Sequence, residues 1–143
     1  MNNESASQSL IRHPQSVAIM LLHSPYTHSI NETALRYVKS LLAQGHSVYR
    51  LFLYHESVHI ASTLSITAQD EINFADAWQT LIHEHNIDCV ACISSSLKRG
   101  IINEQEAKRY DKPHYNIADN IALGGLGDWI EATNTADTHI CFS

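Results

Sequence analysis

Several features that mark large classes of protein are missing from this sequence of 143 residues. It contains no apolar run approaching the ~20 residues that a membrane-spanning helix needs, so we expect no membrane anchor. Lysine and arginine number only nine and are scattered, and the net charge of −6 argues against extensive direct contact with nucleic acid. The three cysteines are an odd number without a secretory leader, which predicts reduced thiols and a cytoplasmic location.

The length suits one domain, and a chain of this size can bury enough surface to fold without a metal ion or a disulfide. Hydrophobic residues make up 44% and charged residues 17%, which is an ordinary globular mixture. Residues 1–15 are polar and contain no apolar core of a signal peptide. We therefore expect a flexible N-terminal extension over residues 1–15 and a single domain over residues 16–143.

Strand and helix patterns alternate along the domain. Apolar runs predict buried strands at residues 16–22, 47–54, 87–93 and 138–142, with a short one at 115–117. Helical spacing predicts helices at residues 29–45, from 67 or 70 to 86, 103–110 and 123–132, with capping boxes at Ser29–Glu32 and Asn103–Glu106. Residues 55–68 read as a longer polar connection. This alternation predicts a parallel sheet with helices on both faces.

The carboxyl ends of parallel strands meet at one edge of a sheet, and ligand and catalytic sites gather there. Cys92 ends the third predicted strand, and the loops after Leu22 and Tyr54 follow the first two. These three segments are therefore predicted to lie at the same edge. Cys92 is followed at once by Ser94, Ser95 and Ser96 and then by Lys98 and Arg99.

Cys89 and Cys92 match the C-x-x-C spacing of redox dithiols, but strand geometry opposes a disulfide between them. Three strand residues span about 10 Å, a disulfide needs Cα atoms within ~7 Å, and an odd offset points the two side chains to opposite faces. No second thiol pair is present for a zinc site. We expect Cys89 and Cys141 to be small buried hydrophobic residues and Cys92 to be a reactive thiol.

A reactive thiol must be partly ionised. An ordinary cysteine has a pKa of ~8.5, and lowering it by two units takes about 2.7 kcal/mol. A helix N-terminus supplies roughly 0.3–1 kcal/mol, and up to ~2 kcal/mol when partly buried. The serines after Cys92 can provide such a helix start, and Lys98, Arg99 or a partner protein can contribute further. The competing interpretation is that the serines are ordinary helix caps and the two cations a solvated helix end.

The segment from Cys92 to Ile101, CISSSLKRGI, resembles the active-cysteine segment of the DsrE/TusD sulfur-relay family. Matching stretches at residues 42–46, 52–58, 77–79 and 123–132 extend the resemblance from about Val17 to Phe142. The resemblance implies a three-layer α/β/α sandwich on a five-stranded, mostly parallel sheet. It also implies that Cys92 accepts sulfane sulfur as a persulfide and relays it to an acceptor protein, with no cofactor beyond this covalent intermediate.

The resemblance further implies partners and an acceptor. Family members of the TusD type assemble with TusB- and TusC-like paralogues into a heterohexamer, and a homo-oligomer is expected of the chain in isolation. A TusA-like carrier supplies sulfur and a TusE-like protein accepts it, for synthesis of 2-thiouridine at the tRNA wobble position. We expect Tyr26, Tyr54 and Glu56 to line the thiol, which should be accessible yet sheltered by partner subunits.

Other functions remain open from the residues alone. DsrE-type relatives serve sulfur oxidation instead of tRNA thiolation, and some paralogues in such complexes are non-catalytic assembly subunits. A hydroxyl-rich loop with Ser24, Thr27 and Ser29 leaves a flavin-binding module as a third alternative. The pairs His55/His59 and His83/His85 are expected to be surface residues rather than metal ligands.

Overall fold

The computed structural model describes residues 13–27 and 29–143, and most of the expected N-terminal extension lies outside these ranges. Five parallel strands form one sheet in the order β4-β3-β2-β1-β5. Their bounds are β1 Ser16–Leu21, β2 Ser47–Leu53, β3 Cys89–Cys92, β4 Ile121–Gly124 and β5 Thr138–Phe142. The last residue of the expected extension is fixed, because Gln15 accepts a hydrogen bond from the Ser47 N–H and donates one to His46 Nδ1.

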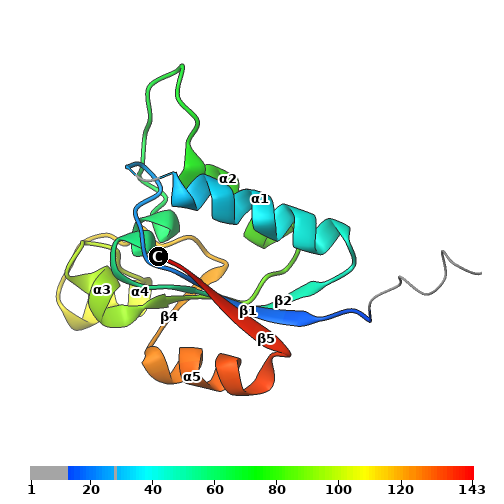
Figure 1. The fold of residues 1–143 in the computed structure, drawn as a ribbon. Coiled ribbons are helices and arrows are strands. Elements are labelled where there is room, and N and C mark those ends of the chain that lie inside the picture. Colours follow the sequence, from blue (N-terminus) through cyan, green and yellow to red (C-terminus); the bar gives the residue numbers. More distant parts are fainter. Residues whose placement is uncertain (1–12, 28) are drawn as a thin grey trace, which may run out of the picture.

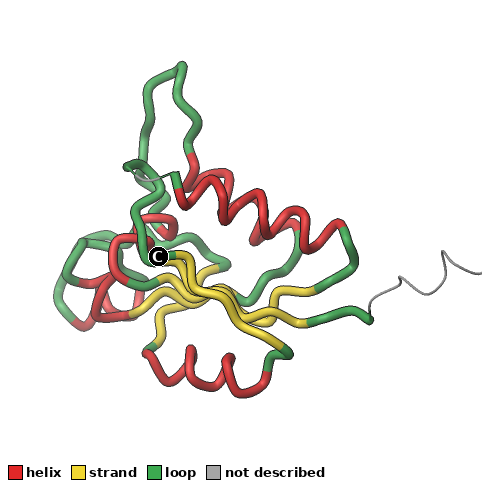
Figure 2. Tube along the Cα trace, in the orientation of Figure 1, coloured by secondary structure: helices red, strands yellow, loops and turns green. Residues whose placement is uncertain are grey.

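Helices cover both faces of the sheet, which confirms the predicted three-layer α/β/α sandwich. Helices α1 (Ile30–Ala43) and α2 (Phe74–Glu84) lie on one face, and α5 (Leu126–Thr135) lies alone on the other (Figure 1, Figure 2). The remaining helices gather at the carboxyl edge: the 3-10 helix η2 (His55–Ala61), α3 (Ile93–Leu97) and α4 (Glu104–Arg109). The predicted polar connection after β2 thus begins with a helical segment.

The larger core lies between the sheet and helices α1 and α2. Trp78 is fully buried there, and its indole N–H donates a 2.9 Å hydrogen bond to Asn31 Oδ1. The Asn31 amide in turn donates to the backbone oxygen of His23 at 2.6 Å. These bonds satisfy two buried polar groups, so burial of the indole and the amide carries no desolvation penalty for an unpaired donor. They also tie the loop after β1 to both helices.

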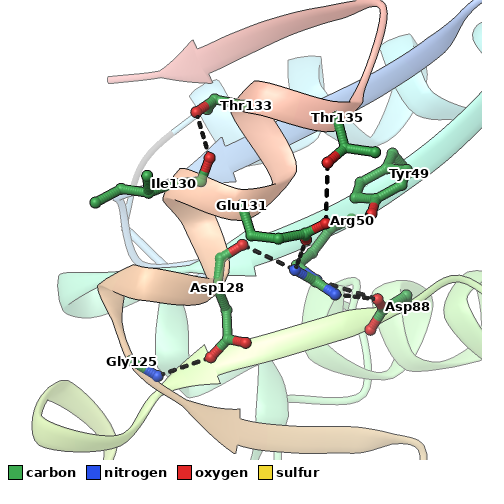
Figure 3. Close-up of polar contacts among 9 residues, drawn as sticks. All are labelled: Tyr49, Arg50, Asp88, Gly125, Asp128, Ile130, Glu131, Thr133 and Thr135. Atoms are coloured by element: carbon green, nitrogen blue, oxygen red, sulfur yellow. Dashed lines mark hydrogen bonds and ion pairs between the residues drawn. The ribbon is translucent and has the colours of Figure 1, made fainter.

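Helix α5 is attached to the opposite face mainly by polar contacts (Figure 3). The Arg50 guanidinium on β2 donates to Asp88, Glu131 and the backbone oxygen of Asp128 at 2.8, 2.7 and 2.8 Å. The Tyr49 hydroxyl donates to the same Glu131 carboxylate at 2.6 Å. Only Ala132 of α5 is buried, so these bonds, together with the packing of Trp129 against Phe52, determine where the helix sits.

Two predicted helix starts are wrong. The Ser29–Glu32 capping box does not form, because Ser29 has helical dihedral angles (φ −63°, ψ −16°) and its side chain makes no cap hydrogen bond. Neither Thr67 nor Asp70 caps α2; Asn73 does, accepting a 3.1 Å hydrogen bond from the Asp76 N–H. A long connection offers many polar cap candidates, and the apolar spacing did not decide between them.

The predicted strand at residues 115–117 is also wrong. Ile117 makes only an isolated antiparallel bridge with Ser62, and the fourth strand is Ile121–Gly124. This strand takes the first residues of the segment predicted as helix 123–132, so α5 begins only at Leu126. A four-residue edge strand is too short for its apolar period to be distinguished from the start of an amphipathic helix.

Gly124 pairs in register with Cys92, at the end of β4. A Cβ atom at this position would overlap the Asp128 carboxylate, which accepts a hydrogen bond from the Gly125 N–H, and would press on the Val90 side chain. Only glycine therefore allows α5 to start so close to β3. Gly127, in the first turn of α5, has no neighbouring atom within 4 Å of such a Cβ.

We expect Gly124→Ala to lower the free energy of unfolding by about 1–3 kcal/mol, because an extra methyl group in a filled space forces its neighbours apart. Gly127→Ala is the matched control and should leave stability unchanged or raise it by up to ~1 kcal/mol, because alanine favours the helix. Urea denaturation monitored by circular dichroism measures both. Equal stability of the two variants would show that α5 does not need this close approach.

Candidate functional site

The candidate site is the junction where β3 ends and α3 begins. Cys92 occupies the N-cap position of α3, with φ −57° and ψ 121°. Its side chain packs with Met20, Phe52 and Val90 on the α5 side of the sheet, whereas Cys89 belongs to the core on the opposite side. The two thiols of the C-x-x-C sequence therefore face away from each other, as the strand geometry predicts, and they cannot form a disulfide.

Two serines of α3 surround the sulfur of Cys92. Ser94 Oγ lies 3.4 Å from Sγ, and the backbone and side chain of Ser95 also form hydrogen bonds with it. Burial acts to raise the pKa of the Cys92 thiol, but the hydrogen bonds from Ser94 and Ser95 outweigh it, so the pKa lies below its ordinary value. Because α3 has only five residues, these local hydrogen bonds, rather than the dipole of a long helix, stabilise the thiolate.

Ser95 is itself held by residues from the end of β2. Its hydroxyl accepts a 3.3 Å hydrogen bond from the His55 N–H, and its backbone oxygen accepts one of 3.0 Å from Arg99. Arg99 also makes a two-point contact with Glu56 Oε1, at 2.8 Å from Nε and 2.6 Å from Nη2. This bond to Arg99 holds the pKa of the Glu56 carboxyl below its usual range. Arg99 and Glu56 thus orient Ser95 without a hydrogen bond to the sulfur.

His55, which follows β2, has an unusual backbone conformation and connects this end of the strand to Ser95. Its φ is +52°, in the left-handed region that residues other than glycine seldom adopt. The imidazole lies against Tyr54, with ring centroids 4.0 Å apart, and this stacking accompanies the turn that aims the His55 N–H at Ser95. Backbone conformations of this kind are concentrated at functional sites.

The other predicted site residues are more dispersed. Tyr54 packs against the Cys92 cluster, as expected of a lining residue. Ser96 is fully buried, and within the described residues its hydroxyl has no hydrogen-bond partner. Lys98 is exposed at the C-cap of α3. Tyr26 lines a separate hollow at the start of α1, beside Glu32 and Phe74.

Cys92 is only 3% exposed in the isolated chain, so the accessible thiol expected from the sequence is not found. Leu22, Tyr54 and Trp129 are partly buried and pack against its cluster. Trp129 comes from α5, and its ring centroid lies 6.3 Å from that of Phe52. The sequence gives no signal for Trp129, because it depends on how α5 lies against the sheet.

The two remaining cysteines differ from each other. Cys89 is 2% exposed, and burial strongly raises the pKa of its thiol, which makes it the inert hydrophobic residue that was predicted. Cys141 is exposed, so its predicted burial is wrong. It lies on the edge strand β5.

Within residues 13–27 and 29–143, no three histidine, cysteine, aspartate or glutamate side chains are grouped so that they could hold a metal ion. The His59 Nε2 atom instead lies 3.4 Å from Oε2 of Glu56. The same part of the chain has no helix that is both long and apolar enough to cross a membrane.

Comparison with known proteins gives consistent matches over nearly the whole chain. The chain is 39% identical over 125 residues to the "Sulfurtransferase TusD homolog" of Pseudomonas aeruginosa, covering 87% of this chain and 95% of the relative. It is 36% identical to the "Sulfurtransferase TusD" of Salmonella dublin, and 32% identical to the "Putative sulfurtransferase DsrE" of Allochromatium vinosum; these matches cover 87% of this chain and 98% and 96% of the relatives.

The solved structure of the YchN protein from E. coli has the same fold, with a TM-score of 0.69 at 18% identity over 90% of this chain and 99% of that one. The model of the "DsrE/DsrF-like family" matches residues 15–142, which include all five strands and the Cys92 junction. With the family model and the sequence relatives in agreement, the chain belongs to the DsrE/DsrF-like family.

Proposed function

We propose that this chain is a sulfurtransferase that carries a sulfane sulfur as a persulfide on Cys92 and relays it to an acceptor protein. The observation that supports this most directly is the lowered pKa of one thiol, held at the end of a central strand by Ser94 and Ser95. The relatives named sulfurtransferases support the same class of reaction. The other two thiols lack this environment.

The chemistry is thiol–persulfide exchange. The Cys92 thiolate attacks the terminal sulfur of a donor persulfide; the donor S–S bond breaks, a new S–S bond forms on Cys92, and the donor leaves as a thiolate. An acceptor thiolate then attacks the outer sulfur, and Cys92 leaves as a thiolate. The outer sulfur keeps its proton in both steps, and no external oxidant or reductant is needed. Because Ser94 and Ser95 stabilise negative charge on Sγ, they favour Cys92 both as nucleophile and as leaving group.

No resolving cysteine from this chain is needed. Cys89 faces the opposite core, and Cys141 lies on β5, which β2 and β1 separate from β3. The sulfur must therefore arrive from one protein and leave to another. Since Cys92 is almost fully covered, docking of either protein has to displace side chains around its cluster, of which Leu22, Tyr54 and Trp129 are the partly buried ones.

The relatives named TusD favour tRNA wobble thiolation as the destination of the sulfur, with a TusA-like donor, a TusE-like acceptor and TusB- and TusC-like paralogues as subunits. The DsrE relative, at 32% identity, favours the alternative, a relay in sulfur oxidation. Loss of wobble 2-thiouridine in cells that lack this chain would support tRNA thiolation over sulfur oxidation. Normal tRNA thiolation in such cells would contradict a role in tRNA thiolation.

Incubation with a persulfide donor should add the mass of one sulfur atom to the wild-type protein, and a thiol reductant should remove it. Cys92→Ser should take up none, whereas Cys89→Ser and Cys141→Ser should load as the wild type does, because their thiols are not stabilised as thiolates. Intact-protein mass spectrometry measures all four. Transferable sulfur on Cys92→Ser would refute the mechanism, and an unloaded wild type would identify a non-catalytic assembly subunit.

The rate of Cys92 alkylation should rise with pH and reach half its maximum at a lower pH than for an ordinary cysteine, because the pKa of Cys92 is lowered in the folded protein. Ser94→Ala removes one hydrogen bond to the thiolate and should move this midpoint to higher pH. Glu56→Gln should move it in the same direction, because Arg99 then holds Ser95 less firmly.

Glu104→Gln is the control for the pH dependence of alkylation. It removes a carboxylate from an ion pair with Lys108 on α4, which is not part of the Cys92 junction, and should leave the midpoint unchanged. An unchanged midpoint in Ser94→Ala and Glu56→Gln would show that α3 does not tune the thiol.

Removing the indole that packs against the Cys92 cluster should make Cys92 react faster at a pH where it is fully ionised. We expect Trp129→Ala to raise the limiting alkylation rate several-fold and to move the midpoint to lower pH, because burial raises the pKa of Cys92 and the indole contributes burial but no hydrogen bond to Sγ. Trp129→Phe should lie between this variant and the wild type. A limiting rate that is the same in all three proteins would mean that the thiol is reached by another path.

A further inference from the structure

The turn that follows β2 is anchored by one buried hydroxyl group, that of Ser57 in η2. The Ser57 side chain is fully buried. Its Oγ accepts a 2.8 Å hydrogen bond from the Tyr54 N–H and lies within hydrogen-bond distance of two backbone oxygens, that of Leu21 at 2.6 Å and that of Tyr54 at 2.7 Å. Because Leu21 is the last residue of β1 and Tyr54 follows β2, this hydroxyl joins the carboxyl ends of two neighbouring strands.

His55 comes directly after this anchored point, and its φ of +52° is not explained by its place in the fold. Two other non-glycine residues have a positive φ, Asn86 and Asp111, and they directly follow the C-caps of α2 and α4, where a left-handed residue is ordinary. His55 instead begins a helix. Its left-handed turn directs its N–H to the Ser95 hydroxyl oxygen, 3.3 Å away. A costly backbone conformation of this kind persists only where the surrounding contacts hold it.

The hydrogen bond from His55 decides where the proton of the Ser95 hydroxyl goes. A serine hydroxyl has one proton and two lone pairs. The His55 N–H can only donate, so it occupies a lone pair of Ser95 Oγ and leaves the hydroxyl proton for another acceptor. The Ser95 side chain also forms a hydrogen bond with the Cys92 sulfur, and a thiolate can only accept. The donors therefore run in one direction, from the His55 N–H through the Ser95 O–H to Sγ, and each bond polarises the next.

The contact between Ser94 and the sulfur has no such direction. Ser94 Oγ lies 3.4 Å from Sγ, and either atom can be the donor. Of the two serine hydroxyls at the thiol, that of Ser95 is thus the one whose proton is aimed by a second residue.

We propose that Ser57 and His55 are positioning residues for the Cys92 thiolate. Ser57 fixes the end of β2, the left-handed turn at His55 aims its N–H at Ser95, and Ser95 then directs its own proton to Sγ. Both residues act through Ser95 rather than by contact with the sulfur. The inference rests on the proposed role of Cys92 and assigns part of that role to the turn after β2.

Charged groups near the thiol do not supply the same stabilisation. The titratable and charged side chains on the elements around Cys92 are those of Tyr54, His55, Glu56, Lys98, Arg99 and Asp128. Glu56 and Arg99 are paired with each other, Lys98 is exposed, and negative charge on Asp128 opposes a thiolate. A protonated His55 imidazole would favour a thiolate, so the test has to separate this ring from the backbone that carries it.

Substitution of His55 makes that separation, because its side chain is exposed and residues differ in how readily they adopt a positive φ. His55→Val should move the midpoint of Cys92 alkylation to higher pH by roughly 0.5–1 unit, since a β-branched residue resists the left-handed turn. His55→Asn and His55→Gly should keep the wild-type midpoint, since both residues adopt the turn and retain the N–H. A midpoint that rises equally in all three variants would assign the effect to the imidazole and overturn the inference.

A double-mutant cycle tests whether the effect passes through Ser95. Ser95→Ala should raise the midpoint by itself, and His55→Val in the same chain should cause no further rise, whereas independent effects would add. Additive shifts would overturn the inference. Because Cys141 is exposed and also reacts, alkylation of Cys92 is read by mass spectrometry of its own peptide.

Ser57→Ala should raise the midpoint too. Its matched control is Ser62→Ala, since Ser62 is a buried serine at the other end of η2 whose hydroxyl accepts a hydrogen bond from the Leu64 N–H. Both variants lose a buried hydroxyl and should lower the thermal midpoint, but only Ser57→Ala should change the pH of half-maximal alkylation. A shift in both variants, or in neither, would remove Ser57 from the proposal.

Persulfide loading of the same proteins keeps this inference separate from the proposed function, because alkylation reads the ionisation of Sγ without any sulfur donor. Normal loading with an unshifted midpoint in His55→Val would refute the positioning role and leave the sulfur relay standing. A shifted midpoint in His55→Val, in a chain whose wild type takes up no sulfur, would support the positioning role and refute the relay.

Discussion

The proposed chemistry depends on one set of hydrogen bonds, those that Ser94 and Ser95 make with the sulfur of Cys92. A buried thiol in an apolar environment is ordinarily inert, and Cys89 is an example. It lies on the same strand as Cys92 but faces the opposite side of the sheet, and burial raises its pKa. Cys92 differs because the chain changes from strand to helix at that residue, which turns hydroxyl and N–H groups toward Sγ. Desolvation acts on both sulfurs, and local donors outweigh it at only one.

The parallel sheet supplies what the β3–α3 junction cannot supply by itself. Because β2 runs beside β3 in the same direction, its exit places His55 and Glu56 next to α3, where they hold Ser95 directly and through Arg99. On the other side, β4 ends in Gly124, whose missing side chain lets Asp128 and α5 approach. The environment of the sulfur is therefore built from three strand ends that are far apart in the sequence, which is what a parallel sheet brings together.

Features of the fold and the candidate site were predictable from the sequence when the residues that form them are close together in the chain. The Cys92 junction was identified because strand, thiol and serines are consecutive, and the opposite orientation of Cys89 follows from the two-residue period of a strand. The role of Arg99 was not predicted. A cation near a cysteine in the sequence indicates direct stabilisation of the thiolate. In the structure, Glu56, which lies 43 positions away, binds Arg99, and Arg99 donates to the backbone oxygen of Ser95. The exposure of Cys141 and the cover by Trp129 depend on how far one helix extends over the sheet, which no local pattern records.

The way in which α5 is attached bears on how the proposed transfer could take place at a covered thiol. In the proposed relay, cover between transfers would protect a thiolate or persulfide on Cys92 from oxidation. That cover includes Trp129 of a helix with a single buried residue, Ala132, held to the sheet by Arg50 and partly exposed carboxylates. The Arg50 side chain is largely enclosed, at 16% exposure, whereas the Asp88 and Glu131 carboxylates that it binds are about half exposed. The side of the sheet that carries Cys92 is therefore covered by a helix with a small apolar contact, whereas α1 and α2 bury the larger core on the opposite side.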